Sequence, residues 1–144
     1  MIVRIALAAV VAAFAATAVM AQSDPIAARK GLMKGIGSAN GAVTQMLDGK
    51  QPFDATKAKA ALMTISENAG KAVSLFPASS KDGDTNALPA VWDNKADFET
   101  KMTKMGADAK AAADKVTDLE SLKAAIGAVR QNCGGCHNVY RAKS

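Results

Sequence analysis

Cysteine and histidine are scarce in this chain of 144 residues, which contains two cysteines and one histidine. All three fall within a segment of five positions, at Cys133, Cys136 and His137. No cysteine remains elsewhere for a long-range disulfide, and no second histidine is available for a His-based catalytic pair or a further metal ligand of that type. The chemistry that these residue types can carry is therefore confined to one short segment near the C-terminus.

Aromatic residues and blocks of like charge are also few. The four Phe, one Trp and one Tyr are scattered, and no Arg/Lys block has aromatic residues between its members. The formal net charge is +5, and charges of both signs alternate along the chain, as on solvated helix faces. We therefore expect no nucleic-acid partner, and the mild basicity indicates at most an acidic partner protein.

Long hydrophobic runs are absent beyond the first 21 residues. Residues 1–21 begin with a single positive charge, Arg4, continue as an Ala/Val-rich run, and end in small residues suited to cleavage before Gln22. The apolar run, residues 5–19, is shorter than the ~20 residues that span a bilayer, which argues against a retained anchor. We expect a cleaved secretory signal, followed by one domain at 22–144 in the bacterial periplasm with no stable membrane insertion.

Proline and β-branched runs are too sparse to support strands, and the four prolines separate helical blocks instead. The first block starts at Pro25, a favoured first-turn residue, and the second starts after an Asp54 N-cap. The last block opens with Thr117-x-x-Glu120, which reads as a capping box. The expected helices cover residues 25–47, 54–75, 93–116 and 117–142.

Apolar residues in these blocks recur in alternating steps of three and four, which is typical of helices packed at shallow crossing angles. The third block has Phe98, Met102, Met105, Ala109, Ala112 and Val116, and the fourth has Leu119, Leu122, Ile126, Val129, Cys133, Cys136 and Tyr140. Short connections after the first and third blocks make each pair antiparallel. The pattern predicts an all-α fold, an antiparallel up-down-up-down four-helix bundle.

The segment "QNCGGCHNVYR" contains the C-x-x-C-H spacing of a c-type haem attachment site. In a helix, Cys133 and Cys136 share one face, and His137 lies one turn after Cys133. Each thiol can then bond covalently to the haem, and the imidazole can bind its iron. The spacing predicts one covalent haem c per chain, with His137 as the proximal axial ligand.

Other uses of the motif fit less well. A Cys/His zinc site needs four ligands, and this chain offers three. A thioredoxin-like pair belongs in a βαβ context, whereas this chain reads as all-helical. A disulfide between Cys133 and Cys136 would leave His137 without a role.

The position of the motif and several other segments resemble the class II cytochromes c, a family that includes high-spin cytochromes c-prime and low-spin cytochromes c-556. These segments are "RKGLMK", "GKQPFDA", "LFPASS", "ALPAVW" and the closing "CGGCHNVYR". The resemblance covers essentially all of residues 22–144. It implies a periplasmic monohaem four-helix bundle that is often a homodimer.

No methionine follows His137, so a methionine ligand on the other face of the iron would have to come from upstream. His137 lies about 8 Å from the end of its helix, a level that meets the starts of the first and third helices. This geometry disfavours Met46, at the far end, and Met63. Met33, Met102 and Met105 remain candidates from the residues alone.

The family resemblance favours Met33, which occupies the position that faces the iron in class II proteins. That position holds a methionine ligand in the c-556 type, and an apolar blocking residue in the c-prime type. The resemblance also implies that Arg29 lies near the haem propionates and that Arg141 lies beside the proximal histidine. Solvated arginines at these positions are the alternatives.

Two functions follow from these readings. The first is a single-electron carrier with His137 and Met33 as axial ligands and an acidic redox partner, which would be drawn to Arg29, Lys30, Lys34, Arg141 and Lys143 near the haem. The second is a five-coordinate protein that binds NO or CO, with Met33 only blocking the site. An enzyme is not expected, because the single histidine leaves no obvious acid–base group for peroxide chemistry.

Overall fold

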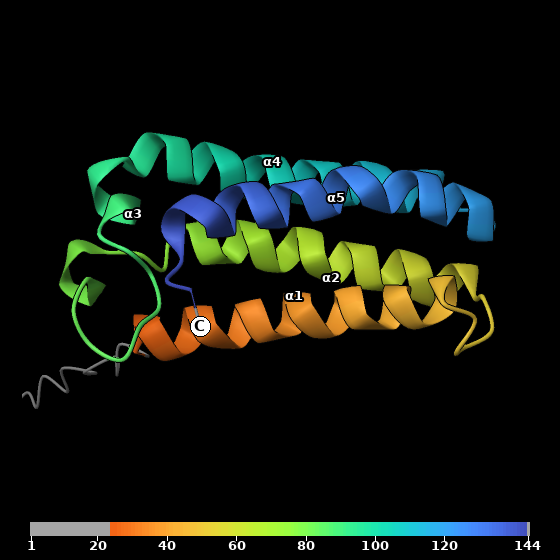
Figure 1. Cartoon of the computed structure of the whole chain (residues 1–144), viewed down its shortest axis with the longest axis horizontal. Helices are drawn as coiled ribbons and strands as arrows, with labels where there is room; N and C mark the ends of the chain where they lie inside the picture. Colours follow the sequence, from red (N-terminus) through yellow and green to blue (C-terminus); the bar gives the residue numbers. More distant parts are fainter. Residues whose placement is uncertain (1–23, 144) are drawn as a thin grey trace, which may run out of the picture.

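Four long helices lie side by side in the computed structural model, which describes residues 24–143 (Figure 1). The predicted secretory signal, residues 1–21, lies outside this range. The long helices are α1 (Pro25–Leu47), α2 (Ala55–Val73), α4 (Lys95–Lys115) and α5 (Leu119–Tyr140). Between α2 and α4 the chain forms a 3₁₀ turn, η1 (Ala78–Ser80), and a short helix, α3 (Ala90–Asp93).

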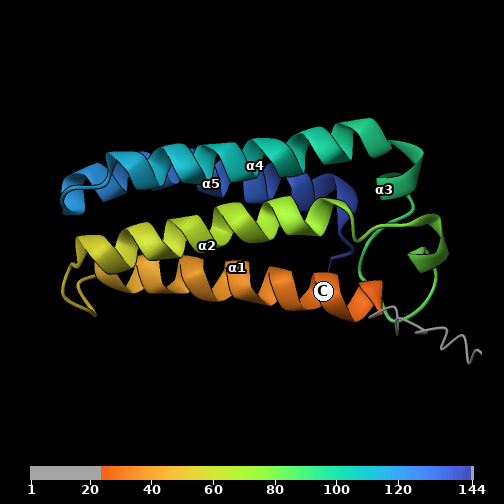
Figure 2. The ribbon, with the colours of Figure 1, turned by 180° about the vertical axis from the view of Figure 1, so that it is seen from behind.

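The helices run alternately up and down. Short turns join α1 to α2 and α4 to α5, and the long connection with η1 and α3 crosses one end of the bundle (Figures 1 and 2). Helix α2 packs along α1 and α4, and α5 packs along α4 but meets α1 at few points. The predicted up-down-up-down four-helix bundle is confirmed.

Side-chain caps explain where the helices begin. The Asp54 carboxylate accepts a hydrogen bond of 3.0 Å from the Lys57 backbone N–H at the start of α2, as predicted. The N-cap of α5 lies one residue later than predicted. Asp118 is its N-cap and forms a capping box with Ser121, whose backbone N–H donates to Asp118 Oδ1 at 2.8 Å. The Thr117 prediction was wrong because Asp is the stronger cap and Ser121 can return the hydrogen bond.

The third helix was predicted to begin at residue 93, whereas α4 begins at Lys95 and residue 93 ends the short helix α3. Asn94, with φ −124° and ψ 47°, leaves helical geometry and separates α3 from α4. The predicted apolar seam of α4 is confirmed, because all six of its residues are buried. Gly106 allows α4 to approach α2 closely, since a Cβ there would lie 3.3 Å from the Ser66 carbonyl oxygen.

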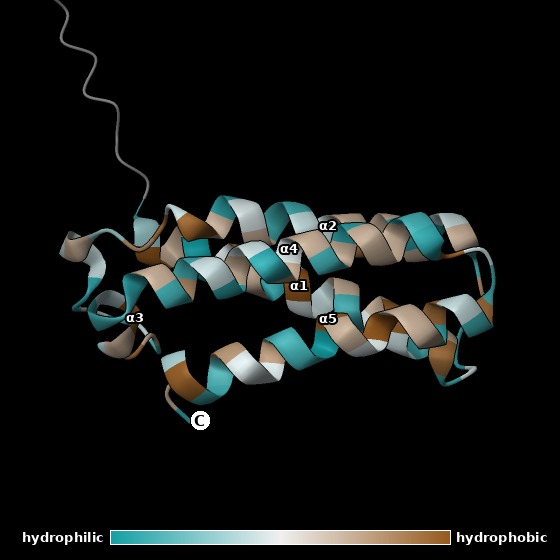
Figure 3. Cartoon of the chain, turned by 90° about the horizontal axis from the view of Figure 1, so that it is seen from above, coloured by the Kyte–Doolittle hydropathy of each residue, from teal (hydrophilic) through white to brown (hydrophobic). Residues whose placement is uncertain are grey.

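The seam of α5 is buried at Leu122, Ile126, Val129 and Tyr140, whereas Leu119 is 41% exposed at the start of the helix. Polar and apolar residues alternate along the long helices (Figure 3). This is the pattern of helices that bury one stripe and solvate the other. Within residues 24–143, no helix has the length and apolar character that a membrane span requires.

We predict that Leu62→Ala lowers the free energy of unfolding by about 3 kcal/mol, because Leu62 is fully buried in α2 between two neighbouring helices. Leu119→Ala is the matched control, with an expected change within about 0.5 kcal/mol. Urea unfolding followed by far-UV circular dichroism measures both. Equal losses for the two variants would contradict the assigned core.

Candidate functional site

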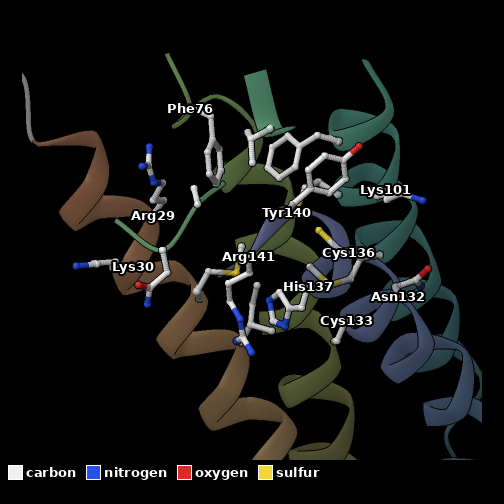
Figure 4. A pocket seen from close by; sticks show the side chains of 18 of the residues that line it. Arg29, Lys30, Phe76, Lys101, Asn132, Cys133, Cys136, His137, Tyr140 and Arg141 are labelled. Carbon is white, nitrogen blue, oxygen red and sulfur yellow. The ribbon is translucent and has the colours of Figure 1, made fainter. Parts of the chain in front are cut away.

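A cavity of about 460 Å³ lies at the end of the bundle where α1 begins and α5 ends. Its walls come from α1, α4, α5 and the connection around residues 85–87 (Figure 4). The volume falls in the range typical of sites for cofactors and small molecules. Three helices and a loop therefore frame a site large enough for a prosthetic group.

Helix α5 places the C-x-x-C-H motif on the wall of this cavity. Cys133, Cys136 and His137 all line it, and each is half-buried. Both cysteines are free thiols, and Cys133 Sγ lies 3.6 Å from the Val129 carbonyl oxygen. The helix continues unbroken through the motif, so the three side chains share one face as predicted.

The cavity wall also sets the protonation of these groups. Burial raises the pKa of both thiols above their ordinary value of 9.0. Burial, together with the nearby Arg141 cation, lowers the pKa of His137 below 6.5. At neutral pH the wall therefore presents two neutral thiols and a neutral imidazole, which retains a lone pair for a metal ion.

Three methionines line the same cavity. Met33 comes from α1 and is half-buried, whereas Met102 and Met105 come from α4 and are buried. Met46 and Met63 are not among the lining residues, in agreement with the sequence-based geometry. The fold thus brings one thioether from α1 and two from α4 to the cavity that holds His137.

Arg29 is buried, with 3% of its surface exposed, and binds the connection between α2 and α3. Its Nη1 donates to Ser80 Oγ at 2.6 Å and to the Leu75 carbonyl oxygen at 3.1 Å. Its Nη2 donates to the Ser80 carbonyl oxygen at 3.0 Å and to Thr85 Oγ1 at 2.8 Å. The alternative of a solvated arginine is wrong, as is the expectation that Arg29 adds an exposed charge for a partner, because its four hydrogen bonds are intramolecular.

The Arg29 guanidinium also stacks on aromatic rings, with its carbon 4.6 Å from the centre of Phe76 and 5.7 Å from that of Trp92. The Trp92 indole N–H donates to the Phe76 and Pro77 carbonyl oxygens at 3.2 and 3.1 Å. Trp92 thus anchors the same connection. Arg29 remains on the cavity lining, so its predicted contact with haem propionates stays a prediction.

Arg141 lies just after α5, is exposed, and lines the cavity beside His137. The backbone around it pairs with the long connection. Ala142 N donates to the Asn86 carbonyl oxygen at 2.8 Å, and Leu88 N donates to that of Tyr140 at 2.9 Å. The sequence did not predict this pairing, since an isolated bridge between Ala87 and Arg141 has no periodic signal.

Aromatic residues that the sequence analysis did not assign to the site also line the cavity. The Phe76 and Phe98 ring centres are 4.6 Å apart, and those of Phe98 and Tyr140 are 5.4 Å apart, both in edge-to-face geometry. The Tyr140 hydroxyl donates to Asp97 Oδ2 at 2.5 Å, which raises the pKa of Tyr140 to about 12. The helical seams had indicated that Phe98 and Tyr140 are apolar core, without showing which rings meet.

Basic side chains stand on the cavity lining. Lys30, Lys101 and Arg141 belong to it, and Lys30 pairs with Asp84 at 2.6 Å. Two further lysines are exposed, Lys34 on α1 and Lys143 in the segment that follows α5. This end of the molecule therefore carries several exposed basic groups. Arg29 is not one of them, because it is buried.

A helical bundle with two free cysteines and one histidine on a cavity wall defines a c-type haem protein. Residues 24–141 match the family model described as Cytochrome C'. The chain belongs to this family, whose members carry covalently bound haem c and act in electron transfer or gas binding. The up-down-up-down bundle is the topology of cytochrome c′.

Individual relatives represent both branches of the family. Cytochrome c′ of Rhodopseudomonas palustris is 43% identical over 125 residues, which cover 86% of each chain. Its solved structure has a TM-score of 0.82 and covers 85% of this chain and 99% of that one. A cytochrome c-556 of Agrobacterium tumefaciens (strain II Chrys) is 42% identical, covering 80% of this chain and 94% of its own.

A third relative carries a small gas molecule. A variant of cytochrome c prime from Alcaligenes xylosoxidans was solved as a nitric oxide complex, with 29% identity and a TM-score of 0.73. The likeness covers 84% of this chain and 95% of that one. The relatives therefore do not decide between the c-prime and c-556 types for this chain.

We predict that Arg29→Leu lowers the free energy of unfolding of the haem-loaded protein by about 3 kcal/mol. The substitution leaves four buried or partly buried oxygen acceptors without their charged donor. Arg130→Leu is the matched control, because Arg130 is exposed and its hydrogen bonds within residues 24–143 go to Asn40 and Thr44. We expect this substitution to cost less than about 1 kcal/mol. Urea titrations would contradict the assigned role if Arg130→Leu cost as much as Arg29→Leu.

Proposed function

We propose that this protein is a periplasmic single-electron carrier with haem c attached through Cys133 and Cys136, His137 as the proximal ligand and Met33 as the sixth ligand. One observation carries the proposal: the Met33 thioether and the His137 imidazole belong to two different helices and line the same cavity. The likeness to cytochromes c-556 supports it.

The residues of the cavity fit a covalent haem. The wall offers two free thiols and an imidazole whose lowered pKa keeps it neutral at neutral pH, in a cavity of about 460 Å³. When bound, haem c supplies a ferric–ferrous couple that accepts and returns one electron. Cys133 and Cys136 would hold the group through thioether bonds, and His137 would donate a nitrogen lone pair to its iron.

The remaining lining controls polarity and access. Phe76, Phe98 and Val91 are buried and exclude water from one side of the cavity. A thioether ligand and an apolar surrounding both favour the reduced state, because the reduced metal carries less charge. The proposed Met33 ligand and this lining therefore both raise the reduction potential.

An acidic redox partner fits the basic end of the molecule. Lys30, Lys101 and Arg141 line the cavity. Lys34 and Lys143 are exposed, and each lies within four residues of one of these lining residues in the sequence. Such a group of cations raises the encounter rate with an acidic surface, and the effect falls as salt is added. A homodimer is compatible with the proposal, and no catalytic turnover or nucleic-acid partner is part of it.

Export completes the proposal. The relatives come from bacteria, and residues 1–21 of this chain have the charge, apolar run and small-residue end of a secretory signal. Cleavage would release residues 22–144 into the periplasm.

The alternative is a five-coordinate haem protein that binds NO or CO. It is favoured by the similarity to cytochromes c′, one of which was solved with nitric oxide. In this reading Met33 blocks the site without bonding, and Met102 and Met105 extend the apolar wall. His137, Cys133 and Cys136 keep the same roles.

We predict that the ferric protein shows a low-spin optical spectrum with a methionine–iron charge-transfer band, and that Met33→Ala abolishes the band. Removal of the thioether would leave the sixth position without its strong ligand. Met46→Ala is the matched control, because Met46 is buried away from the cavity, and its spectrum should match the wild type. A high-spin wild-type spectrum that Met33→Ala leaves unchanged would support the NO/CO alternative instead.

The attachment site has its own test. Trypsin cleavage after Arg130 and Arg141 releases peptide 131–141, and we predict that this peptide carries the mass of one haem. Substitution of both cysteines by serine should abolish covalent attachment of haem. Cys133→Ser alone should leave haem attached by a single bond through Cys136. Haem recovered on another peptide, or fully extractable from the wild type by acidified organic solvent, would show that the assignment is wrong.

A further inference from the structure

Helix α5 has little packing where it carries the motif. Its buried residues are Leu122, Ile126, Val129 and Tyr140, so none of the ten consecutive positions 130–139 is fully buried. Within that stretch, the half-buried Cys133 and Cys136 are the apolar side chains that pack against the core. Side chains in that stretch line the cavity or face solvent. Two glycines at positions 134 and 135 further weaken the helix there, at a cost of about 1 kcal/mol each relative to alanine. Core packing in this segment is therefore confined to two small, half-buried side chains, and it holds the rotation of the segment only weakly.

Two carboxylates of α4 reach α5 on either side of the motif. Asp108 Oδ2 accepts from the Asn132 amide at 2.7 Å, one residue before Cys133. Asp97 Oδ2 accepts from the Tyr140 hydroxyl at 2.5 Å, three residues after His137. Asn132 and Tyr140 lie on either side of the motif side chains in Figure 4.

Each carboxylate is also held by a lysine one turn away on α4. Lys104 Nζ lies 2.6 Å from Asp108 Oδ2, and Lys101 Nζ lies 3.7 Å from Asp97 Oδ1. The Lys104 and Asn132 hydrogen bonds keep the pKa of Asp108 below its ordinary value of 3.8. Both carboxylates are therefore acceptors that a lysine holds on α4, and hydrogen bonds of carboxylates paired in this way are among the stronger ones in proteins.

We propose that Asp97 and Asp108 are positioning residues that fix the rotation of the motif segment of α5 and so aim Cys133, Cys136 and His137 into the cavity. The pair acts as two clamps, Asp97–Tyr140 and Asp108–Asn132, on either side of the weakly packed stretch. This role rests on the proposed haem attachment and extends it to α4, which supplies none of the attachment residues.

The test uses the haem-loaded protein with Tyr140→Phe, Asp108→Ala and the double variant. Tyr140→Phe keeps the ring that packs edge-to-face on Phe98 and removes only the hydroxyl.

Asp114→Ala is the matched control. Asp114 makes the same kind of ion pair on α4, with Lys110 at 3.4 Å, and none of its side-chain hydrogen bonds within residues 24–143 reaches α5. Asp108→Asn tests rescue, since an amide oxygen can still accept from Asn132.

Hydrogen–deuterium exchange is the first readout. Loss of either clamp should speed exchange of the amides at 131–137 about tenfold relative to those at 63–72 in α2, because one charge-assisted hydrogen bond no longer opposes local opening. The double variant should exceed the sum of the single changes in opening free energy. Asp114→Ala should stay within about twofold of the wild type, and Asp108→Asn should fall between the wild type and Asp108→Ala.

Soret circular dichroism is the second readout, because it reports how the attached group sits in its helical surroundings. We expect its shape to change in Tyr140→Phe and Asp108→Ala and to stay unchanged in Asp114→Ala. The proposal is overturned if amide exchange in the clamp variants speeds up equally in α2 and α5. It is also overturned if exchange at 131–137 speeds up as much in Asp114→Ala as in the clamp variants. Faster local exchange with unchanged dichroism also overturns it, since the clamps would then stabilise α5 without aiming it.

The two proposals fail in different ways. A wild-type peptide 131–141 without haem overturns the proposed attachment, and the exchange data then decide only whether the two clamps hold α5. Haem on that peptide with no local change in the variants overturns the positioning role and leaves the attachment intact.

Discussion

Arg29 holds together the end of the bundle on which the site depends. From the first turns of α1, its four hydrogen bonds bind the connection that leaves α2, and its charge stacks on Phe76 and Trp92. The same connection then pairs through Asn86 and Leu88 with the backbone that follows α5. One buried cation thus links the start of α1 to the end of the helix that carries the motif, with the cavity between them.

The helices around the cavity divide the chemistry between them. Helix α5 contributes Cys133, Cys136 and His137, α1 contributes Met33, and α4 contributes an apolar wall and two carboxylates that reach α5. Because these contributions come from separate elements, the distal side can change without altering the attachment site. This separation explains physically how one family can include both electron carriers and gas binders.

Much of the fold followed from local rules. The bounds of α1, the Asp54 cap and the buried seam of α4 were predicted, because steric caps and the helical period act within a few residues. The break at Asn94 and the shift of the α5 cap to Asp118 were missed. At both places several neighbouring residues could serve as a cap, and tertiary packing selects among them.

The residues of the motif were equally clear from the chain, since the spacing of two cysteines and a histidine on one helix face needs no tertiary information. The sequence alone therefore determined a helical bundle and its haem type, and it predicted His137 as one axial ligand. Only the tertiary structure decided that Arg29 is a buried loop anchor and that Tyr140 binds Asp97. Such contacts join residues more than forty positions apart, and no local propensity records which distant partner a side chain meets.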